Sequence, residues 1–300
     1  MRWRVTHTPA GRSAQPPGRA VVDPVGHNTP VAAQLRGLAR SFCLTSTVDH
    51  NSQHLVIVPA YNEAGTVGEV VRSLRSHVPD FDVLVIDDGS TDATREVATA
   101  AGARTLRMPF NLGIGGAVQA GFVYALENGY DYVLQFDGDG QHIASEIVHL
   151  RAAMAEDPSL DMVCGSRFLS AEHGYPAPIS RRTGIHVFAF LLSRIIGQRV
   201  SDPTSGFRLC NRRGIALFAR DYPHDYPEVE AVVMLHYHRL RMREVPVTMR
   251  PRGSGRSSIG SGKSLYYMVK VLLAIFIGLA RRRPTPEPGD EAPVAAAQNI

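Results

Sequence analysis

The sequence has few cysteines and no apolar run long enough to cross a bilayer, and each scarcity excludes a class of protein. Its 300 residues include three cysteines, Cys43, Cys164 and Cys210, too few and too widely spaced for a disulfide framework or a Cys-x-x-Cys metal site. The longest apolar run, residues 265–280, contains Lys270 and is shorter than the roughly 20 residues of a membrane span. The first residues lack the apolar segment of a secretory signal. We therefore expect a cytoplasmic protein without a transmembrane helix.

The excess of positive charge is small, which argues against a nucleic-acid partner. There are 32 Lys and Arg residues against 28 Asp and Glu residues, a net charge of +4. The charge is uneven: residues 49–240 hold 16 basic and 23 acidic residues, whereas residues 241–283 hold ten basic residues and Glu244 as their one acid. We interpret the acidic body as a site for a metal ion, and the basic flank as a surface for an anionic partner such as a membrane.

The pattern of the chain predicts an α/β domain built on a mostly parallel sheet with helices on both faces. From residue 54, short β-branched runs alternate with helical periodicity. We predict strands at residues 55–59, 82–87, 104–108, 132–137 and 161–165, and helices at residues 66–77, 91–101, 114–128 and 144–156. Further on, we predict helices at residues 184–196 and 228–240, a strand at residues 242–247 and a C-terminal apolar helix at residues 265–280.

We predict that the chain consists of four parts. Residues 1–50 are rich in Arg, Pro, Gly, Thr and Ser and are expected to be a disordered extension. Residues 51–263 form the α/β domain. Residues 264–283 form a helix with a basic end that lies at a membrane interface or packs against protein, and residues 284–300 form a disordered tail.

Acidic and turn-forming residues follow three of the predicted strands. The first strand ends in Pro59-Ala60-Tyr61-Asn62-Glu63, the second in Asp87-Asp88-Gly89-Ser90, and the fourth in Asp137-Gly138-Asp139-Gly140-Gln141-His142. Ligands bind at the carboxyl ends of strands in an open parallel sheet. These distant segments are therefore predicted to form one site.

Asp137 and Asp139 flank a glycine, so both carboxylates can point to one side of the loop. An isolated pair there repels unless a cation lies between the two charges. With the Gln141 amide oxygen as a third ligand, the oxygen set suits Mg²⁺ or Mn²⁺. The alternative is an ordinary Asp-Gly turn, which the other acidic strand ends make less attractive.

Asp87 and Asp88 exceed what a simple turn needs. Ser90 is predicted to cap the helix that starts at residue 91, and one of the two acids is then available to a ribose or a base.

The order of these motifs resembles family 2 glycosyltransferases. The three strand-end motifs appear with Asn111-Leu112-Gly113 between the second and the third. Further along, Gly165-Ser166-Arg167, residues 202–208 (Asp-Pro-Thr-Ser-Gly-Phe-Arg) and Glu228-Val229-Glu230 resemble the branch that contains dolichyl-phosphate mannose synthases and bacterial polyprenyl-phosphate glycosyltransferases. The resemblance covers about residues 54–260.

The resemblance implies a GT-A fold, a nucleotide-sugar donor of the GDP-mannose or UDP-glucose type, a Mg²⁺ or Mn²⁺ ion, and transfer of a hexose with inversion. Asp88 would contact the ribose or base with support from Asp87. The other implied donor-side residues are Pro59, Tyr61, Glu63, Asn111 and Gly115, and the implied metal ligands are Asp137, Asp139 and Gln141.

In the same way, the resemblance implies an acceptor site for a polyprenyl phosphate. Arg167 and one of Arg181 or Arg182 would clamp its phosphate, with Ser205 and Arg208 nearby. A phosphate monoester is already anionic at neutral pH, so it needs arginine clamps rather than a strong general base. A hydroxyl acceptor needs a base, for which Asp202 is the best candidate, although Asp202 could equally organise its loop.

Two alternatives to the polyprenyl-phosphate transferase stay open. One is the same fold with a hydroxyl acceptor, in polysaccharide or secondary-metabolite synthesis. The other is a non-catalytic subunit that binds a nucleotide sugar. We expect the protein at the inner face of the cell membrane, with the helices at residues 184–196 and 265–280 in the lipid interface. The alternative for both helices is a contact within a homodimer or with the sheet. The non-catalytic subunit would have a membrane-protein partner.

Overall fold

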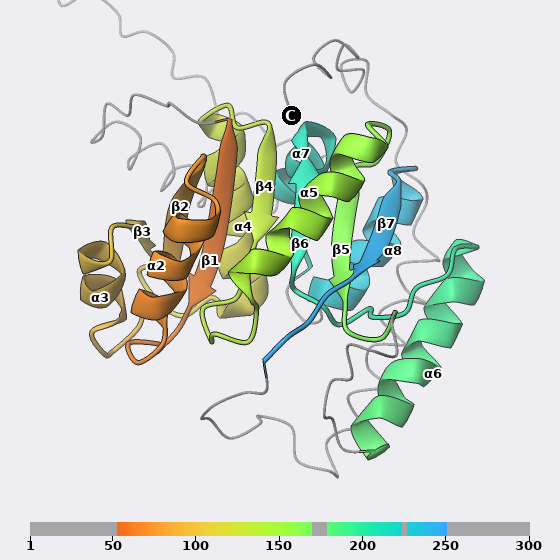
Figure 1. The fold of residues 1–300 in the computed structure, drawn as a ribbon, viewed down its shortest axis with the longest axis horizontal. Coiled ribbons are helices and arrows are strands. Elements are labelled where there is room, and N and C mark those ends of the chain that lie inside the picture. The colour runs from red at the N-terminus through yellow and green to blue at the C-terminus, as the bar shows by residue number, and fades with distance from the viewer. Residues whose placement is uncertain (1–52, 170–178, 224–226, 251–300) are drawn as a thin grey trace, which may run out of the picture.

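A computed structural model describes residues 53–169, 179–223 and 227–250, where seven strands form one sheet (Figure 1). The sheet order is β3-β2-β1-β4-β6-β5-β7. Strand β6 runs antiparallel to both of its neighbours, and the other neighbouring pairs are parallel. The strands are β1 (His54–Ala60), β2 (Phe81–Asp87), β3 (Arg104–Arg107), β4 (Tyr132–Gln135), β5 (Met162–Ser166), β6 (Arg208–Asn211) and β7 (Met242–Pro246).

Helices cover both faces of this sheet. In Figure 1, α5 crosses in front of the central strands, and α4 lies behind them. The helices are α2 (Val67–His77), α3 (Thr94–Ala100), α4 (Gly113–Glu127), the short 3₁₀ helix η1 (Ala144–Glu146), α5 (Ile147–Glu156), α6 (Ile179–Ile196), α7 (Arg212–Arg220) and α8 (Pro227–Tyr237).

Strand β1 is apolar at every position from Leu55 to Ala60, and the packing on its two faces explains why. Leu55 and Ile57 belong to the core cluster that includes α4, α7 and α8, whereas Val56 and Val58 belong to the cluster that includes α2 and α5. Successive side chains point to opposite faces, so a strand covered on both faces has no polar side. Because β1 lies between β2 and β4, the chain order reverses there, and such a switch point places a ligand site at the carboxyl ends of these strands.

The structure confirms the predicted α/β class and the strands and helices of the first half to within a few residues. Two elements of the second half were missed, namely β6 and α7. Strand β6 has four residues and includes the fully buried Arg208, so it lacks an apolar signature. Helix α7 does carry a signal: Asn211 caps it by accepting hydrogen bonds from the backbone N–H groups of Arg213 and Gly214.

The prediction that Ser90 caps a helix from residue 91 is wrong. Helix α3 begins at Thr94, and the Asp92 carboxylate accepts a hydrogen bond from the Thr94 N–H (3.0 Å). The Ser90 hydroxyl instead accepts a hydrogen bond from the backbone of Asn62 (2.9 Å), so it ties two loops together.

Helix α6 begins at Ile179, five residues before its predicted start. Among the helices that the structure describes, none is long and apolar enough to cross a membrane. The predicted extension at residues 1–50, the helix at residues 265–280 and the tail at residues 284–300 lie outside the described residues.

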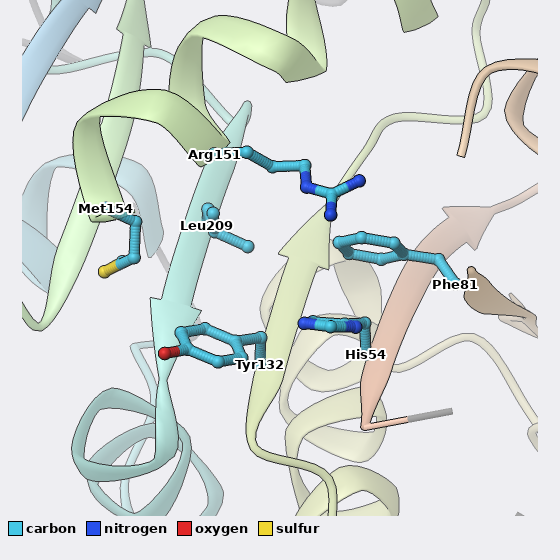
Figure 2. Close-up of a pocket in the computed structure, with 6 residues that line it drawn as sticks. All are labelled: His54, Phe81, Tyr132, Arg151, Met154 and Leu209. Carbon is cyan, nitrogen blue, oxygen red and sulfur yellow. The ribbon is translucent and has the colours of Figure 1, made fainter. Parts of the chain in front are cut away.

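A small pocket lined by aromatic side chains lies where β1, β2 and β4 begin, at the opposite end of these strands from their carboxyl ends (Figure 2). The ring of His54 stacks on Phe81 (4.8 Å between centroids) and on Tyr132 (5.3 Å), and the Arg151 guanidinium lies over Phe81. Burial lowers the pKa of His54, and the attraction of Asp80 does not compensate. The neutral imidazole is therefore the form that this packing favours.

We predict that His54→Phe makes stability less sensitive to acid. The pKa of His54 is lower in the folded protein than its ordinary value of 6.5, so the unfolded chain takes up a proton first as the pH falls. The stability contributed by neutral His54 is present above pH 6.5 and lost below it. Thermal unfolding at pH 7.5 and 5.5 should show a smaller decrease in Tm for His54→Phe than for the wild type. Substitution of the exposed His77 by Gln is the control, and an unchanged pH slope in His54→Phe contradicts the prediction.

Candidate functional site

The loops that follow β1 and β2 are fastened to each other by Asn62. This residue has a φ of 55°, in the left-handed region that asparagine tolerates better than most residues. Its backbone N–H donates to the Ser90 hydroxyl (2.9 Å), and its side-chain oxygen accepts a hydrogen bond from the backbone of Thr91 (2.9 Å). These bonds join the two loops at the carboxyl ends of β1 and β2, and we call the joined segments the rim.

Two threonines extend this rim. The backbone of Glu63 donates to the hydroxyl of the fully buried Thr94 (2.8 Å), which also bonds Asp92. The Thr66 hydroxyl lies 2.9 Å from the carbonyl oxygen of Gly138, in the loop after β4. Hydrogen bonds thus join the segments that follow three different strands, and the predicted strand ends come together.

The predicted donor residues Asp87 and Asp88 are buried and already hold backbone groups. Asp88 accepts hydrogen bonds from the backbone N–H groups of Leu112 (2.8 Å) and Gly113 (2.9 Å), at the start of α4. Burial raises the pKa of Asp88 and outweighs the opposite effect of these bonds. Asp87 accepts from the backbone of Ser90 (2.9 Å). A carboxylate has further lone pairs, so a contact with the nucleoside stays a prediction.

The other predicted donor residues surround the same rim. Tyr61 is 46% exposed beyond the end of β1, whereas Pro59 is buried within β1. The Asn111 side chain is exposed and accepts a hydrogen bond from Gly113 (2.9 Å), and Gly115 is buried in the first turn of α4.

The loop after β4 holds the predicted metal ligands. The Nε2 atom of His142 lies 3.1 Å from Asp137 Oδ2, and the His142 ring stacks on Phe207. Burial raises the pKa of Asp137, but the charges and hydrogen bond of His142, Arg167 and Arg208 outweigh it, so the net shift is downward. Asp139 is bonded to the backbone N–H (3.0 Å) and the side-chain amide of Gln141.

The oxygen atoms of Asp137, Asp139 and Gln141 are of the kind that suits a divalent cation, and their role as metal ligands stays a prediction. Among the described residues, no group of three or more His, Cys, Asp and Glu side chains is placed to hold a metal ion. The candidate set differs because it has two carboxylates and one amide, which leaves the remaining ligand positions to water and a diphosphate. A Cβ atom on Gly206 would lie 3.0 Å from both Asp137 oxygens, so glycine at this position keeps them open.

Arg167 and Asp202 form a buried ion pair beside this loop. Arg167 follows β5, and its Nε and Nη2 atoms donate to the two oxygens of Asp202 (2.7 and 2.8 Å). The backbone N–H of Arg167 also donates to Asp202 (3.1 Å), and Nη2 donates to the Thr204 hydroxyl (2.8 Å). Asp202 is 1% exposed and Arg167 is 8% exposed. The predicted phosphate clamp and the predicted base are thus bound to each other.

Arg208 and Ser205, the other predicted residues of this region, are also buried. Arg208 is 1% exposed, and its guanidinium donates to the carbonyl oxygens of Ser205 (2.9 Å) and Glu228 (2.5 Å). Burial raises the pKa of Glu228, an effect that the charge of Arg208 opposes. Ser205 is 1% exposed, so in this conformation its hydroxyl is remote from solvent.

A cavity of about 330 Å³ lies between α6 and the end of β5. Phe168, which directly follows Arg167, lines it together with Phe190 and Ser201. Arg181 and Arg182 lie in the N-terminal part of α6, and their side chains are outside the described residues.

Several residues that hold the site together were missed by sequence reasoning, among them His142, Thr204 and Glu244. His142 and Thr204 stand inside quoted motifs, where their position was the signal. Glu244 lies in β7 and accepts a hydrogen bond from the backbone N–H of Asp202 (2.9 Å). It is the one acid in a strongly basic stretch, but composition alone did not connect it to the loop at Asp202.

The sheet order, with the loops at its switch point, is that of the GT-A fold. The crystal structure of glucosyl-3-phosphoglycerate synthase from Mycobacterium tuberculosis shares this fold, with a TM-score of 0.58, 19% identity and 86% of each chain covered. The model of glycosyl transferase family 2 matches residues 55–217. The chain belongs to this family and is a glycosyltransferase.

Curated relatives extend over most of the domain. The undecaprenyl-phosphate mannosyltransferase of Micrococcus luteus is 33% identical over 217 residues, which cover 69% of this chain and 88% of the relative. The polyprenol monophosphomannose synthase of Mycolicibacterium smegmatis is 30% identical over 236 residues, which cover 75% of this chain and 88% of the relative.

We predict that Arg167→Ala lowers the free energy of unfolding by about 3 kcal/mol, because it leaves the Asp202 carboxylate buried without its counter-charge. The matched control is Arg212→Ala. Arg212 pairs with Asp131 at 3.1 Å on the surface, where such a pair contributes less than about 1 kcal/mol. Urea unfolding of both variants tests the difference, and equal losses contradict it.

Proposed function

We propose that this chain is an inverting, metal-dependent hexosyltransferase that moves a sugar from a nucleotide donor to a polyprenyl phosphate. The observation that carries the proposal is the buried Arg167–Asp202 pair beside the loop of Asp137 and Asp139. The guanidinium is fixed next to the place where a diphosphate would bind, as a phosphate acceptor requires. The names of the relatives from Micrococcus luteus and Mycolicibacterium smegmatis, which specify polyprenol-type acceptors, support the same acceptor class.

The hydrogen bonds that Asp202 accepts favour a phosphate acceptor over a hydroxyl acceptor. A hydroxyl group needs a general base with an available oxygen. Both oxygens of Asp202 accept hydrogen bonds from Arg167, and Oδ1 also accepts one from Thr204 (3.1 Å). Both oxygens are thus engaged with groups of the protein, whereas an acceptor that is already anionic needs no general base.

The reaction follows from this arrangement. An oxygen of the acceptor phosphate attacks the anomeric carbon and forms the new C–O bond. The bond from that carbon to the donor diphosphate breaks, and the nucleoside diphosphate leaves with the electron pair. A single displacement of this kind inverts the configuration. The contribution of Arg167 is to hold the acceptor oxygen in line and to offset the repulsion between the two anions.

Asp137, Asp139 and Gln141 would hold Mg²⁺ or Mn²⁺. When bound, such an ion neutralises charge on the departing diphosphate. The residues of the chain position it: His142 orients Asp137, and the Gln141 backbone orients Asp139. Asp87, Asp88, Tyr61 and the rest of the rim around Asn62 would receive the nucleoside of a donor of the GDP-mannose or UDP-glucose type.

We propose further that the protein works at the inner face of the cell membrane. Val187 and Phe190 expose apolar surface on α6 (44% and 65% exposed), and Phe190 lines the cavity next to Phe168. An acceptor held by Arg167 would have its chain near this cavity. The ten basic residues in 241–283 support attraction to anionic lipids.

The direct test is transfer of radioactive sugar. Purified protein, Mn²⁺ and labelled GDP-mannose or UDP-glucose are incubated with a polyprenyl phosphate, or with a sugar carrying only hydroxyl acceptors. Label in the lipid extract supports the proposal, and label in the water-soluble saccharide supports the hydroxyl alternative.

We predict that Asp139→Asn removes metal-dependent donor binding while the fold is kept. For the wild type, Mn²⁺ with a nucleoside diphosphate at a hundred times its Kd adds about 2.7 kcal/mol of stability, which a thermal shift detects. The variant should lose this shift. Asp131→Asn, at the other end of β4, is the control and should keep it. Nucleotide binding that is equally tight in EDTA contradicts the prediction.

We predict that Phe190→Asp raises the acceptor KM for a long-chain polyprenyl phosphate by about tenfold and changes it little for a short, water-soluble analogue, because the substitution removes an apolar contact that the bound chain would bury. Val148→Asp is the control, since Val148 is 59% exposed on α5. Equal effects on both acceptors, or the same effect in Val148→Asp, contradict a chain-binding role for α6.

A further inference from the structure

Glu244 supports the loop that carries Asp202, although Glu244 lies in a different strand. Its Oε2 atom accepts hydrogen bonds from the backbone N–H and from the hydroxyl of Ser201 (both 2.7 Å). Its Oε1 atom accepts a hydrogen bond from the backbone N–H of Asp202 (2.9 Å). Both oxygens of one carboxylate thus hold two consecutive residues of the loop.

Ser201, which Glu244 binds, is also in contact with the segment that carries Arg167. The hydroxyl groups of Ser201 and Ser166 lie 2.6 Å apart, and Ser166 directly precedes Arg167. The Ser166 hydroxyl also accepts a hydrogen bond from the backbone of Phe168 (3.2 Å). Because β7 pairs with β5 in parallel, Glu244 stands opposite Cys164, two residues before Ser166. Glu244 is therefore linked to both segments that carry the ion pair.

We propose that Glu244 is a positioning residue for acceptor binding, which fixes the Arg167–Asp202 pair by holding the Ser201–Asp202 backbone. The proposal rests on the proposed function in one respect, namely that Arg167 binds the acceptor phosphate. Glu244 itself does not touch the acceptor. It sets the direction from which Asp202 meets the guanidinium.

The chemistry of the contacts explains why a carboxylate stands here. Two backbone N–H groups and one hydroxyl converge on Glu244, and three donors require an acceptor at both oxygens. A glutamine would offer one oxygen and one NH₂ group, and the NH₂ group would face a donor. The arrangement also has a cost: burial raises the pKa of Glu244, and the nearby charge of Asp202 acts in the same direction. A surface role would not require this cost.

The first experiment compares Glu244→Gln with Arg243→Gln. Arg243 is the preceding residue in β7, and its ion pairs with Glu156 and Asp157 lie on the surface. For Glu244→Gln we expect the acceptor kcat/KM to decrease about tenfold or more, since displacement of a positioned group by 1 Å can cost a hundredfold. The Kd for nucleoside diphosphate with Mn²⁺ should stay within about twofold, as only the acceptor side is disturbed. Arg243→Gln should change neither.

A double-mutant cycle separates positioning from general support of the fold. Arg167→Lys keeps the charge but removes the planar fork that meets Asp202. If Glu244 acts through Arg167, its substitution costs little more once the fork is gone, and the two losses in acceptor kcat/KM are not additive. Fully additive losses, or a donor Kd that weakens as much as the acceptor KM, overturn the proposal. If Glu244→Gln does not fold, Ser201→Ala, which removes one of the three contacts, replaces it in the cycle.

A second measurement does not depend on the acceptor. The Nε–H group of Arg167 is bonded to Asp202 and gives an NMR resonance that Arg167→Lys deletes, which assigns it. In Glu244→Gln this resonance should shift and exchange faster with solvent; an unchanged resonance overturns the positioning role. If the wild type transfers no sugar to a polyprenyl phosphate while the resonance does shift, the proposed function fails and the positioning of Arg167 stands.

Discussion

The reversed direction of β6 is the constraint on which the proposed acceptor side of the site depends. A strand that runs antiparallel between β4 and β5 must begin at the edge where those two strands end. Residues 201–207, which lead into β6, are thereby delivered to the carboxyl ends of β4 and β5. The ion pair of Arg167 with Asp202 and the close approach of Gly206 to Asp137 both follow from this reversal.

The two sides of the site are held by different forces. On the donor side, hydrogen bonds between side chains and backbone fasten the loops, as at Asn62 and Asp88. On the proposed acceptor side, the ion pair of Arg167 with Asp202 is added to such bonds, and Glu244 holds the Asp202 backbone. Short polar side chains suffice where a loop only has to keep its shape, whereas fixed charges are required where an anion has to be recognised.

The parts of this structure that sequence predicts are those governed by local periodicity. Short β-branched runs locate β1 and β2, and the rule for parallel sheets then brings Asp87 and Asp137 to one edge. Periodicity fails for β6, because its buried Arg208 donates to the carbonyl oxygen of Glu228, which only the tertiary structure brings near. The link from Glu244 to Asp202 spans 42 residues and has no local signature either.

The buried charges also explain how the site can be ready before an acceptor arrives. Moving Arg167 and Asp202 out of water is costly, and their mutual attraction offsets that cost only when geometry and hydrogen bonds are good. Here Asp202 has two contacts with the guanidinium and a third with the Arg167 backbone, and its own backbone N–H donates to Glu244. The orientation of the Arg167 guanidinium is thus set during folding rather than during the reaction. A guanidinium fixed in this way can interact with a phosphate without first being reoriented, which is the condition under which electrostatic stabilisation contributes most to a rate.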